Sequence, residues 1–71
     1  MGIRAPIAQR TTLSPRQQQV AERVAQGKRE HEIAADLGIA VNTVKVHKSI
    51  IYRKLGVRNA VELTLALQRA A

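Results

Sequence analysis

Three glycines, Gly27, Gly38 and Gly56, each follow a stretch of helical periodicity and divide the chain into four short segments. A glycine just past the last apolar position is typical of a helix end, because it readily adopts the left-handed conformation that closes a helix. No segment shows the strict alternation of apolar and polar residues that marks a strand. The sequence therefore predicts an all-α fold with short connections. The expected helices cover about residues 15–26, 30–37, 41–55 and 59–69.

Chain length and charge narrow the kind of partner. With 71 residues and no cysteine, the chain is long enough for one small domain and cannot form disulfides or thiolate metal sites. Twelve lysines and arginines against five acids give a net charge of +7, which is typical of proteins that bind polyanions. Tyr52 is the only aromatic residue, so stacking platforms for single-stranded nucleic acid are missing. Duplex DNA is therefore the expected partner. The lack of cysteine favours a cytoplasmic location, and no apolar run is long enough for a membrane span.

The first segment of the chain differs from the rest. Residues 1–12 show no helical or strand period, contain Pro6, and carry Arg4 and Arg10 without an acid. We interpret this segment as a flexible basic arm or linker, and residues 13–71 as the folded domain. A remnant from outside the functional domain and an arm that enters the minor groove of DNA are both open at this point.

Two of the expected helices have clear start signals, and one does not. Ser14 and Gln17 form a capping box, in which each side chain can bond the backbone N–H of the other residue. Asn59 and Glu62 form the same pattern before the last helix. Arg29 stands at the cap position of the second helix, where it cannot accept a hydrogen bond from an amide. The second helix is therefore expected to begin weakly.

The second and third helices form a pair with a tight turn between them. The second is short, the turn contains Gly38, and the third is long and basic, which is the plan of a helix-turn-helix. Residues 13–71 are therefore expected to form a four-helix bundle with a central helix-turn-helix. Helical spacing predicts that the inner face of the third helix is formed by Val44, His47, Ile51 and Leu55. The opposite face carries Asn42, Lys45, Val46, Ser49 and Arg53.

Charge is distributed unevenly along the chain. Four of the five acids lie between Glu22 and Asp36, whereas residues 37–61 contain five lysines and arginines and no acid. These cations coincide with the outward face of the longest helix, so we expect that face to meet the negative charge of DNA. A basic face that contacts only water is the alternative.

The residues also resemble a known family. Thr43-Val44-Lys45-Val46-His47, followed by Lys54-Leu55-Gly56-Val57, is similar to the helix-turn-helix domain of LuxR-type (NarL/FixJ, GerE-like) bacterial transcription regulators. The match covers residue 13 to about residue 67, and further matching positions are Leu13-Ser14-Pro15-Arg16, Gly27, Glu32-Ile33-Ala34, Leu37, Ile39 and Ile51. The resemblance implies a nucleoid-associated DNA-binding domain whose third helix reads the major groove. It also implies that the domain forms a homodimer through its fourth helix. We expect this homodimer to bind an inverted repeat in DNA.

The resemblance and the outward face of the third helix together suggest roles for individual residues. The expected base-reading residues, whose side chains can bond base edges or touch a thymine methyl, are Lys45, Val46, Ser49 and Asn42. The residues expected to contact backbone phosphates are Thr43, Lys48, Arg53, Arg29 and His31. The last helix has apolar residues on two faces, and the face expected to form the dimer interface contains Val61, Thr64 and Leu65. Burial of both faces within the domain is the alternative.

Three positions depart from the family pattern. Gln17 replaces a common acid, Arg29 replaces the usual Ser or Thr cap of the second helix, and Ala40 replaces a frequent Ser before the third. The loss of each cap hydroxyl is expected to cost about 0.5 to 2 kcal/mol of stability. Arg29 in return adds a cation beside the expected phosphate backbone. The receiver or ligand-binding domain that most relatives carry is not part of this sequence, so we expect either a stand-alone regulator or an excised effector domain.

Other function classes fit the sequence less well. His31-Glu32 begins like the zinc motif H-E-x-x-H, but the motif fails at Ala35, and no Gly-rich phosphate loop is present. No enzyme activity, cofactor or metal is therefore expected. The alternative function is an adaptor that binds RNA polymerase or another regulator and has only non-specific DNA affinity, because the last helix has spare apolar surface. Steep salt dependence would distinguish DNA binding from such an apolar contact.

Overall fold

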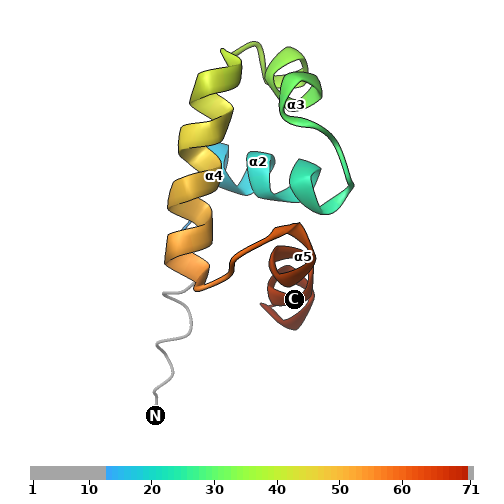
Figure 1. The fold of residues 1–71 in the computed structure, drawn as a ribbon, viewed down its shortest axis with the longest axis vertical. Helices are drawn as coiled ribbons and strands as arrows, with labels where there is room; N and C mark the ends of the chain where they lie inside the picture. The colour runs from blue at the N-terminus through green and yellow to red at the C-terminus, as the bar shows by residue number, and fades with distance from the viewer. Residues whose placement is uncertain (1–12, 71) are drawn as a thin grey trace.

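The computed structural model describes residues 13–70, and that range contains four α-helices (Figure 1). Their bounds are Pro15–Ala25 for α2, Glu30–Leu37 for α3, Val41–Leu55 for α4 and Ala60–Ala70 for α5. The predicted all-α fold is confirmed, and each helix begins and ends within one residue of its expected position. The expected arm, residues 1–12, lies outside the described residues.

Helix α2 begins with the capping box that the sequence predicts, and α5 begins with one of the two hydrogen bonds predicted for it. At α2 the Ser14 hydroxyl accepts from the Gln17 N–H at 3.1 Å, and the Gln17 side chain accepts from the Ser14 N–H at 3.0 Å. At α5 the Asn59 side-chain oxygen accepts from the Glu62 N–H at 2.9 Å. The Glu62 carboxylate accepts from the N–H of Arg58 at 2.8 Å, one residue before the partner expected for a capping box. Both starts therefore have two backbone N–H groups satisfied locally.

Helices α3 and α4 begin without a side-chain cap. The Arg29 side chain makes no cap hydrogen bond, because a guanidinium has no acceptor. The Glu32 carboxylate partly compensates, since it accepts from the Arg29 N–H at 2.8 Å. Ala40 precedes α4 without a cap hydrogen bond, and the first turn of α4 contains no acid. The missing side-chain cap expected for the second helix is confirmed, and α4 lacks one as well.

Gly38 closes α3 and opens the turn of the helix-turn-helix. Its φ of +67° lies in the left-handed region, which a residue with a Cβ rarely adopts. The N–H of Ile39 then donates to the Ala34 carbonyl oxygen at 3.0 Å, which satisfies a carbonyl of the last turn. Gly56 closes α4 in the same way, with a φ of +66°. These left-handed residues explain why the connections are short.

The hydrophobic core lies between the helices, and each of the four contributes to it. Its buried side chains are Val20, Ala21, Val24, Ile33, Ala34, Val44, Ile51 and Leu63. Partly buried residues, among them Leu55 and Leu67, pack around this cluster. Within the described chain the core contains no buried polar or charged residue. Because apolar burial is the main favourable contribution to folding, this cluster is what orients α3 and α4 relative to each other.

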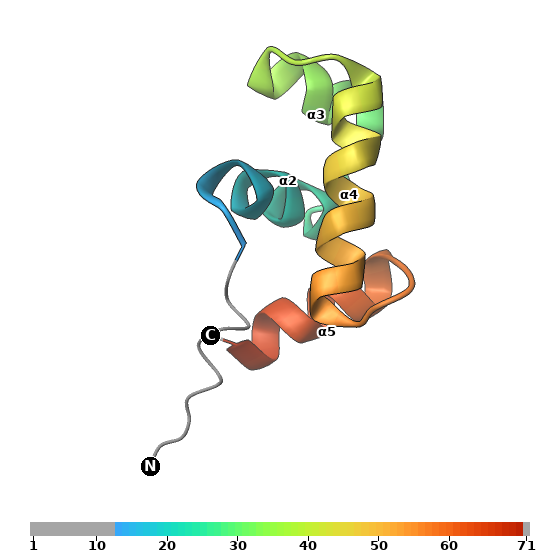
Figure 2. The ribbon, with the colours of Figure 1, turned by 90° about the vertical axis from the view of Figure 1, so that its left-hand side faces the viewer.

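Helix α4 runs along the length of the domain, and the other helices lie mostly to one side of it (Figure 1). Each of α2, α3 and α5 packs against α4. When the left-hand side of Figure 1 is turned toward the viewer, α4 lies in front of the other helices (Figure 2). One long face of α4 is therefore not covered by the rest of the described chain. Across residues 13–70, no helix has both the length and the apolar character that a membrane crossing requires.

A cluster of charged side chains joins α3 to α2 and to the loop that follows it. Lys28 Nζ donates to an Asp36 carboxylate oxygen at 2.6 Å. Arg23 Nε lies 3.6 Å from the same oxygen, which is an ion pair without a hydrogen bond. The Lys28 hydrogen bond is the main cause that lowers the pKa of Asp36 below its ordinary value of 3.8, while partial loss of hydration opposes it. Because all three side chains stay partly exposed, the cluster adds little to stability.

Candidate nucleic-acid interface

The uncovered face of α4 contains the residues that helical spacing placed opposite its core side. Val44 and Ile51 on the core side are fully buried, and His47 and Leu55 are partly buried. We define the outer face of α4 by five exposed residues, Asn42, Lys45, Val46, Ser49 and Arg53. The predicted division of this helix into an inner and an outer face is therefore confirmed.

The outer face of α4 combines cations with an exposed aliphatic side chain. Val46 is 51% exposed, so half of its aliphatic side chain is in contact with water. Within the described range, the side chains of Lys45 and Arg53 form no hydrogen bond or ion pair with the rest of the chain. Lysine and arginine can donate to guanine O6 and N7, and an aliphatic group can contact the methyl of thymine. The outer face therefore offers groups that match the edges of bases.

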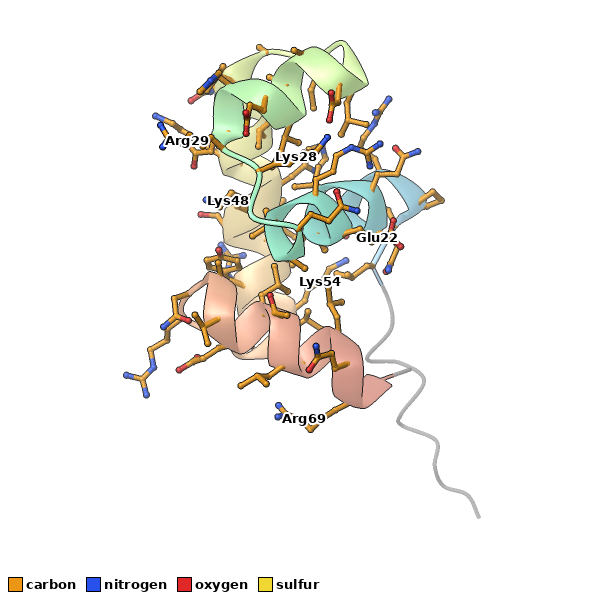
Figure 3. All side chains as sticks on the ribbon, turned by 90° about the vertical axis from the view of Figure 1, so that its right-hand side faces the viewer. Glu22, Lys28, Arg29, Lys48, Lys54 and Arg69 are labelled. Carbon is orange, nitrogen blue, oxygen red and sulfur yellow. The ribbon has the colours of Figure 1, made fainter. Side chains whose placement is uncertain are left out.

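The other candidate residues around this face do not share one environment. Arg29 and His31, at the start of α3, are exposed, and so is Thr43 in the first turn of α4. Lys48 is partly buried, and its Nζ lies 3.1 Å from Glu30 Oε2. Arg29 and Lys48 lie at the same edge of the molecule, where α3 begins beside α4 (Figure 3). Lys48 is thus already paired within the chain, whereas the other three candidates point to solvent.

The outer side of α5 is apolar and exposed. Val61 is 70% exposed and Leu65 is 47% exposed, whereas Leu63 is fully buried in the core. Thr64 is partly buried, and its hydroxyl donates to the Ala60 carbonyl oxygen at 2.9 Å. The alternative in which both faces of this helix are buried is wrong for residues 13–70. We call Val61, Thr64 and Leu65 the outer face of α5.

The fold and the basic outer face of α4 fit a helix-turn-helix regulator, and comparison with protein families identifies the kind. The family model described as bacterial regulatory proteins, luxR family, matches residues 11–67. The chain belongs to the LuxR family. Members of this family are DNA-binding transcription regulators, so the LuxR-family domain described here is a regulatory domain and not an enzyme. The resemblance seen in the sequence is confirmed.

Similarity to individual regulators extends over most of this LuxR-family chain. It is 44% identical over 63 residues, 89% of the chain, to the transcriptional regulatory protein UhpA of Escherichia coli (strain K12). It is 48% identical over 59 residues, 83% of the chain, to the two-component response regulator PprB of Pseudomonas aeruginosa. It is 44% identical over 63 residues, again 83% of the chain, to the transcriptional activator protein EsaR of Pantoea stewartii subsp. stewartii. The chain spans 32%, 22% and 25% of these proteins. No solved structure matches it.

Two contacts of this LuxR-family domain carried no signal in the sequence. Lys48 pairs with Glu30 across 18 positions, and Lys54 Nζ donates to Gln17 Oε1 at 3.1 Å across 37 positions. Such contacts follow from how the helices approach one another and have no period along the chain. Gln17 therefore still contacts α4, although it lacks the acid that is common at this position. In the part of the chain that the structure describes, no three His, Cys, Asp or Glu side chains are placed to hold a metal ion.

Proposed function

We propose that this LuxR-family domain binds duplex DNA sequence-specifically, with α4 in the major groove, to regulate transcription. The observation that carries the proposal is the outer face of α4, which is exposed, basic and without an acid. The major groove of B-DNA admits an α-helix and displays a distinct pattern of donors, acceptors and methyl groups for each base pair. Because the bacterial chromosome is the target, we expect the protein to act in the cytoplasm, at the nucleoid.

In this proposal the candidate residues divide into base readers and phosphate contacts. Lys45 donates to a guanine, Val46 touches a thymine methyl, and Asn42 and Ser49 bond neighbouring base edges. These four lie on the outer face of α4, which supports the assignment. The phosphate contacts, which fix the register of the domain on the duplex, come from Arg29, His31, Thr43, Lys48 and Arg53.

We further propose that two copies of the domain bind an inverted repeat and meet through the outer face of α5. Val61 and Leu65 leave adjacent aliphatic surface in water, which favours coverage by a partner. In a two-fold dimer the same patch is used by both copies, so an apolar patch meets an identical one. The hydroxyl of Thr64 is already bonded within α5, so burying it in such an interface would leave no unpaired donor.

The test is a selection from a library of random duplex DNA with the purified chain at near-physiological salt. The expected result is enrichment of two inverted half-sites whose centres lie about 10 base pairs apart. A single enriched half-site would contradict dimer binding and keep the reading of DNA by α4. No enrichment at all would contradict sequence-specific binding.

A matched pair of variants tests the outer face of α5 separately. Leu65→Glu places a charge in the proposed interface, and it is expected to keep binding a half-site while losing the cooperative binding to the inverted repeat. Gln19→Glu adds the same charge on the exposed side of α2 and is expected to leave that cooperativity intact. Equal behaviour of the two variants would show that the outer face of α5 is not the dimer interface.

A second candidate function is that of an adaptor that contacts RNA polymerase or another regulator. The exposed Val61 and Leu65 favour it, because they suit a protein partner as well as a second copy. Salt dependence separates the two functions. The logarithm of the DNA-binding constant should fall by about 0.9 per neutralised phosphate for each unit of log salt concentration, whereas an apolar protein contact should change little.

A further inference from the structure

Glu30 brings a negative charge to the edge of the proposed DNA-binding surface. Its Oε2 lies 3.1 Å from Lys48 Nζ, and the two side chains are 33% and 26% exposed. The same ammonium lies 5.9 Å from the centre of the Tyr52 ring. The pair links the first turn of α3 to the middle of α4, at the edge where Arg29 also lies (Figure 3). Residues 37–61 contain no acid of their own, so the negative charge beside Lys48 comes from α3.

A phosphate that approaches this edge has a competitor for Lys48. A lysine without a partner offers its full charge, but a lysine that is bonded to a carboxylate offers a pair with little net charge. If the phosphate takes Lys48 over, Glu30 is left unpaired beside another anion, and the two repel. Because both side chains are only partly exposed, this competition is screened less than it would be between fully exposed charges.

We propose that Glu30 competes with the DNA backbone for Lys48 and thereby lowers the sequence-independent affinity of the domain. The inference rests on the proposed function and deepens it, because it assigns a residue that sets the strength of one phosphate contact. Phosphate contacts contribute to every sequence alike. Removal of the Glu30 charge should therefore strengthen binding to a selected duplex and to a scrambled duplex by the same factor.

The first experiment measures binding of the 71-residue chain to both duplexes over a range of salt concentrations. Glu30→Gln keeps the size of the side chain and removes its charge. We expect about two- to fivefold tighter binding to both duplexes near 0.1 M salt, and a salt slope that is steeper by up to about 0.9. Glu22→Gln removes the same charge from α2, well away from Lys48 in Figure 3, and is the matched control.

The second experiment tests whether the gain passes through Lys48. Lys48→Met keeps an unbranched stem against the Tyr52 ring and removes the ammonium. In the Lys48→Met background, Glu30→Gln should increase the DNA affinity no more than the control Glu22→Gln does. Lys48→Met by itself should reduce the salt slope by well under 0.9, because Glu30 already offsets most of the Lys48 charge.

Three results would overturn the proposal. The first is an increase in DNA affinity for Glu30→Gln no larger than that for Glu22→Gln. The second is an increase for Glu30→Gln that persists in the Lys48→Met background. The third is a full reduction of about 0.9 in the salt slope for Lys48→Met alone. Failure of DNA binding itself has a different result: the unsubstituted chain would show no salt-dependent affinity for either duplex. That result would contradict both the proposed DNA binding and the proposed role of Glu30. Thermal unfolding checks that Glu30→Gln is folded under assay conditions, and Lys48→Met alone decides the matter if it is not.

Discussion

The framework helices α2 and α5 and the helix-turn-helix pair α3 and α4 begin in different ways. The first two start with Ser14 and Asn59, whose side chains accept hydrogen bonds from N–H groups of the first turn. The other two start with Arg29 and Ala40, which make no side-chain cap. A cap contributes about 0.5 to 2 kcal/mol, so the pair proposed to contact DNA lacks a source of stability that the framework has. Helices α3 and α4 are therefore held mainly by their packing on the framework.

The largest effect is expected where the framework helix α5 meets the core. Leu63→Ala removes a fully buried side chain and should lower the free energy of unfolding by about 2 to 5 kcal/mol, a large share of the stability of so small a domain. Leu65→Ala, on the same helix but 47% exposed, is the matched control and should cost under about 1 kcal/mol. Urea unfolding followed by circular dichroism measures both. Equal losses would show that α5 has no distinct core face.

The next effect concerns the helix-turn-helix pair and should appear in binding, not in stability. Lys45→Ala is expected to weaken binding to the best DNA site by about 1 to 3 kcal/mol and to change which base is preferred there. Its unfolding free energy should stay unchanged, because Lys45 is exposed and has no partner among the described residues. Arg69→Ala removes one cation from the exposed end of α5 and is the control. An unchanged base preference for Lys45→Ala would remove Lys45 from the base readers.

The caps themselves provide the third prediction, which reverses the difference between the two pairs. Ala40→Ser supplies the missing hydroxyl at the start of α4 and should raise the free energy of unfolding by about 0.5 to 2 kcal/mol. Ser14→Ala removes the cap of α2 and should lower it by a similar amount. Thermal unfolding of both variants compares them directly. If Ala40→Ser left stability unchanged, the missing cap at Ala40 would not weaken the start of α4.

Local signals explain how much of this domain could be predicted from its sequence. A cap and its partner stand three residues apart, a glycine marks each closed helix end, and core positions recur at helical spacing. Helix bounds, the Ser14 cap and the buried side of α4 were therefore all predictable. The Glu62 carboxylate was misassigned by one residue, because it accepts from Arg58 and not from Asn59. That choice depends on loop geometry, which the pattern of residue types does not specify.

Contacts between helices were not predictable, and they matter most at the candidate interface. The sequence suggested Lys48 as a phosphate contact from its charge and position on α4, but it gave no sign of Glu30 as its partner. Long charged side chains pair according to how their helices approach in space, and such pairs leave no period in the sequence. The roles of Lys45 and Val46 in reading bases rest on exposure and family resemblance, and they stay predictions until DNA binding is measured.

The smallest effect is expected at one of the polar contacts between the two pairs of helices, the contact of Lys28 with Asp36. The Lys28 hydrogen bond lowers the pKa of Asp36 from its ordinary value of 3.8, so the ionised carboxylate is favoured in the folded state. The stability gained is fully present above the unfolded-state pKa and is lost as the pH falls through the lower folded-state pKa. Asp36→Asn should therefore lower the melting temperature near neutral pH and lose this effect in strong acid.

Salt and a second acid sharpen this last prediction. Asp36 is partly exposed, so the difference between the unsubstituted chain and Asp36→Asn should be small and should shrink as salt is added. Glu22→Gln is the control, because Glu22 forms no ion pair among the described residues. Melting temperatures of the three proteins from about pH 2 to pH 7 test the assignment. If the Asp36→Asn difference persisted undiminished at the acid end, the cause would be packing at the start of the turn, and the charged cluster would not be what links α3 to the framework.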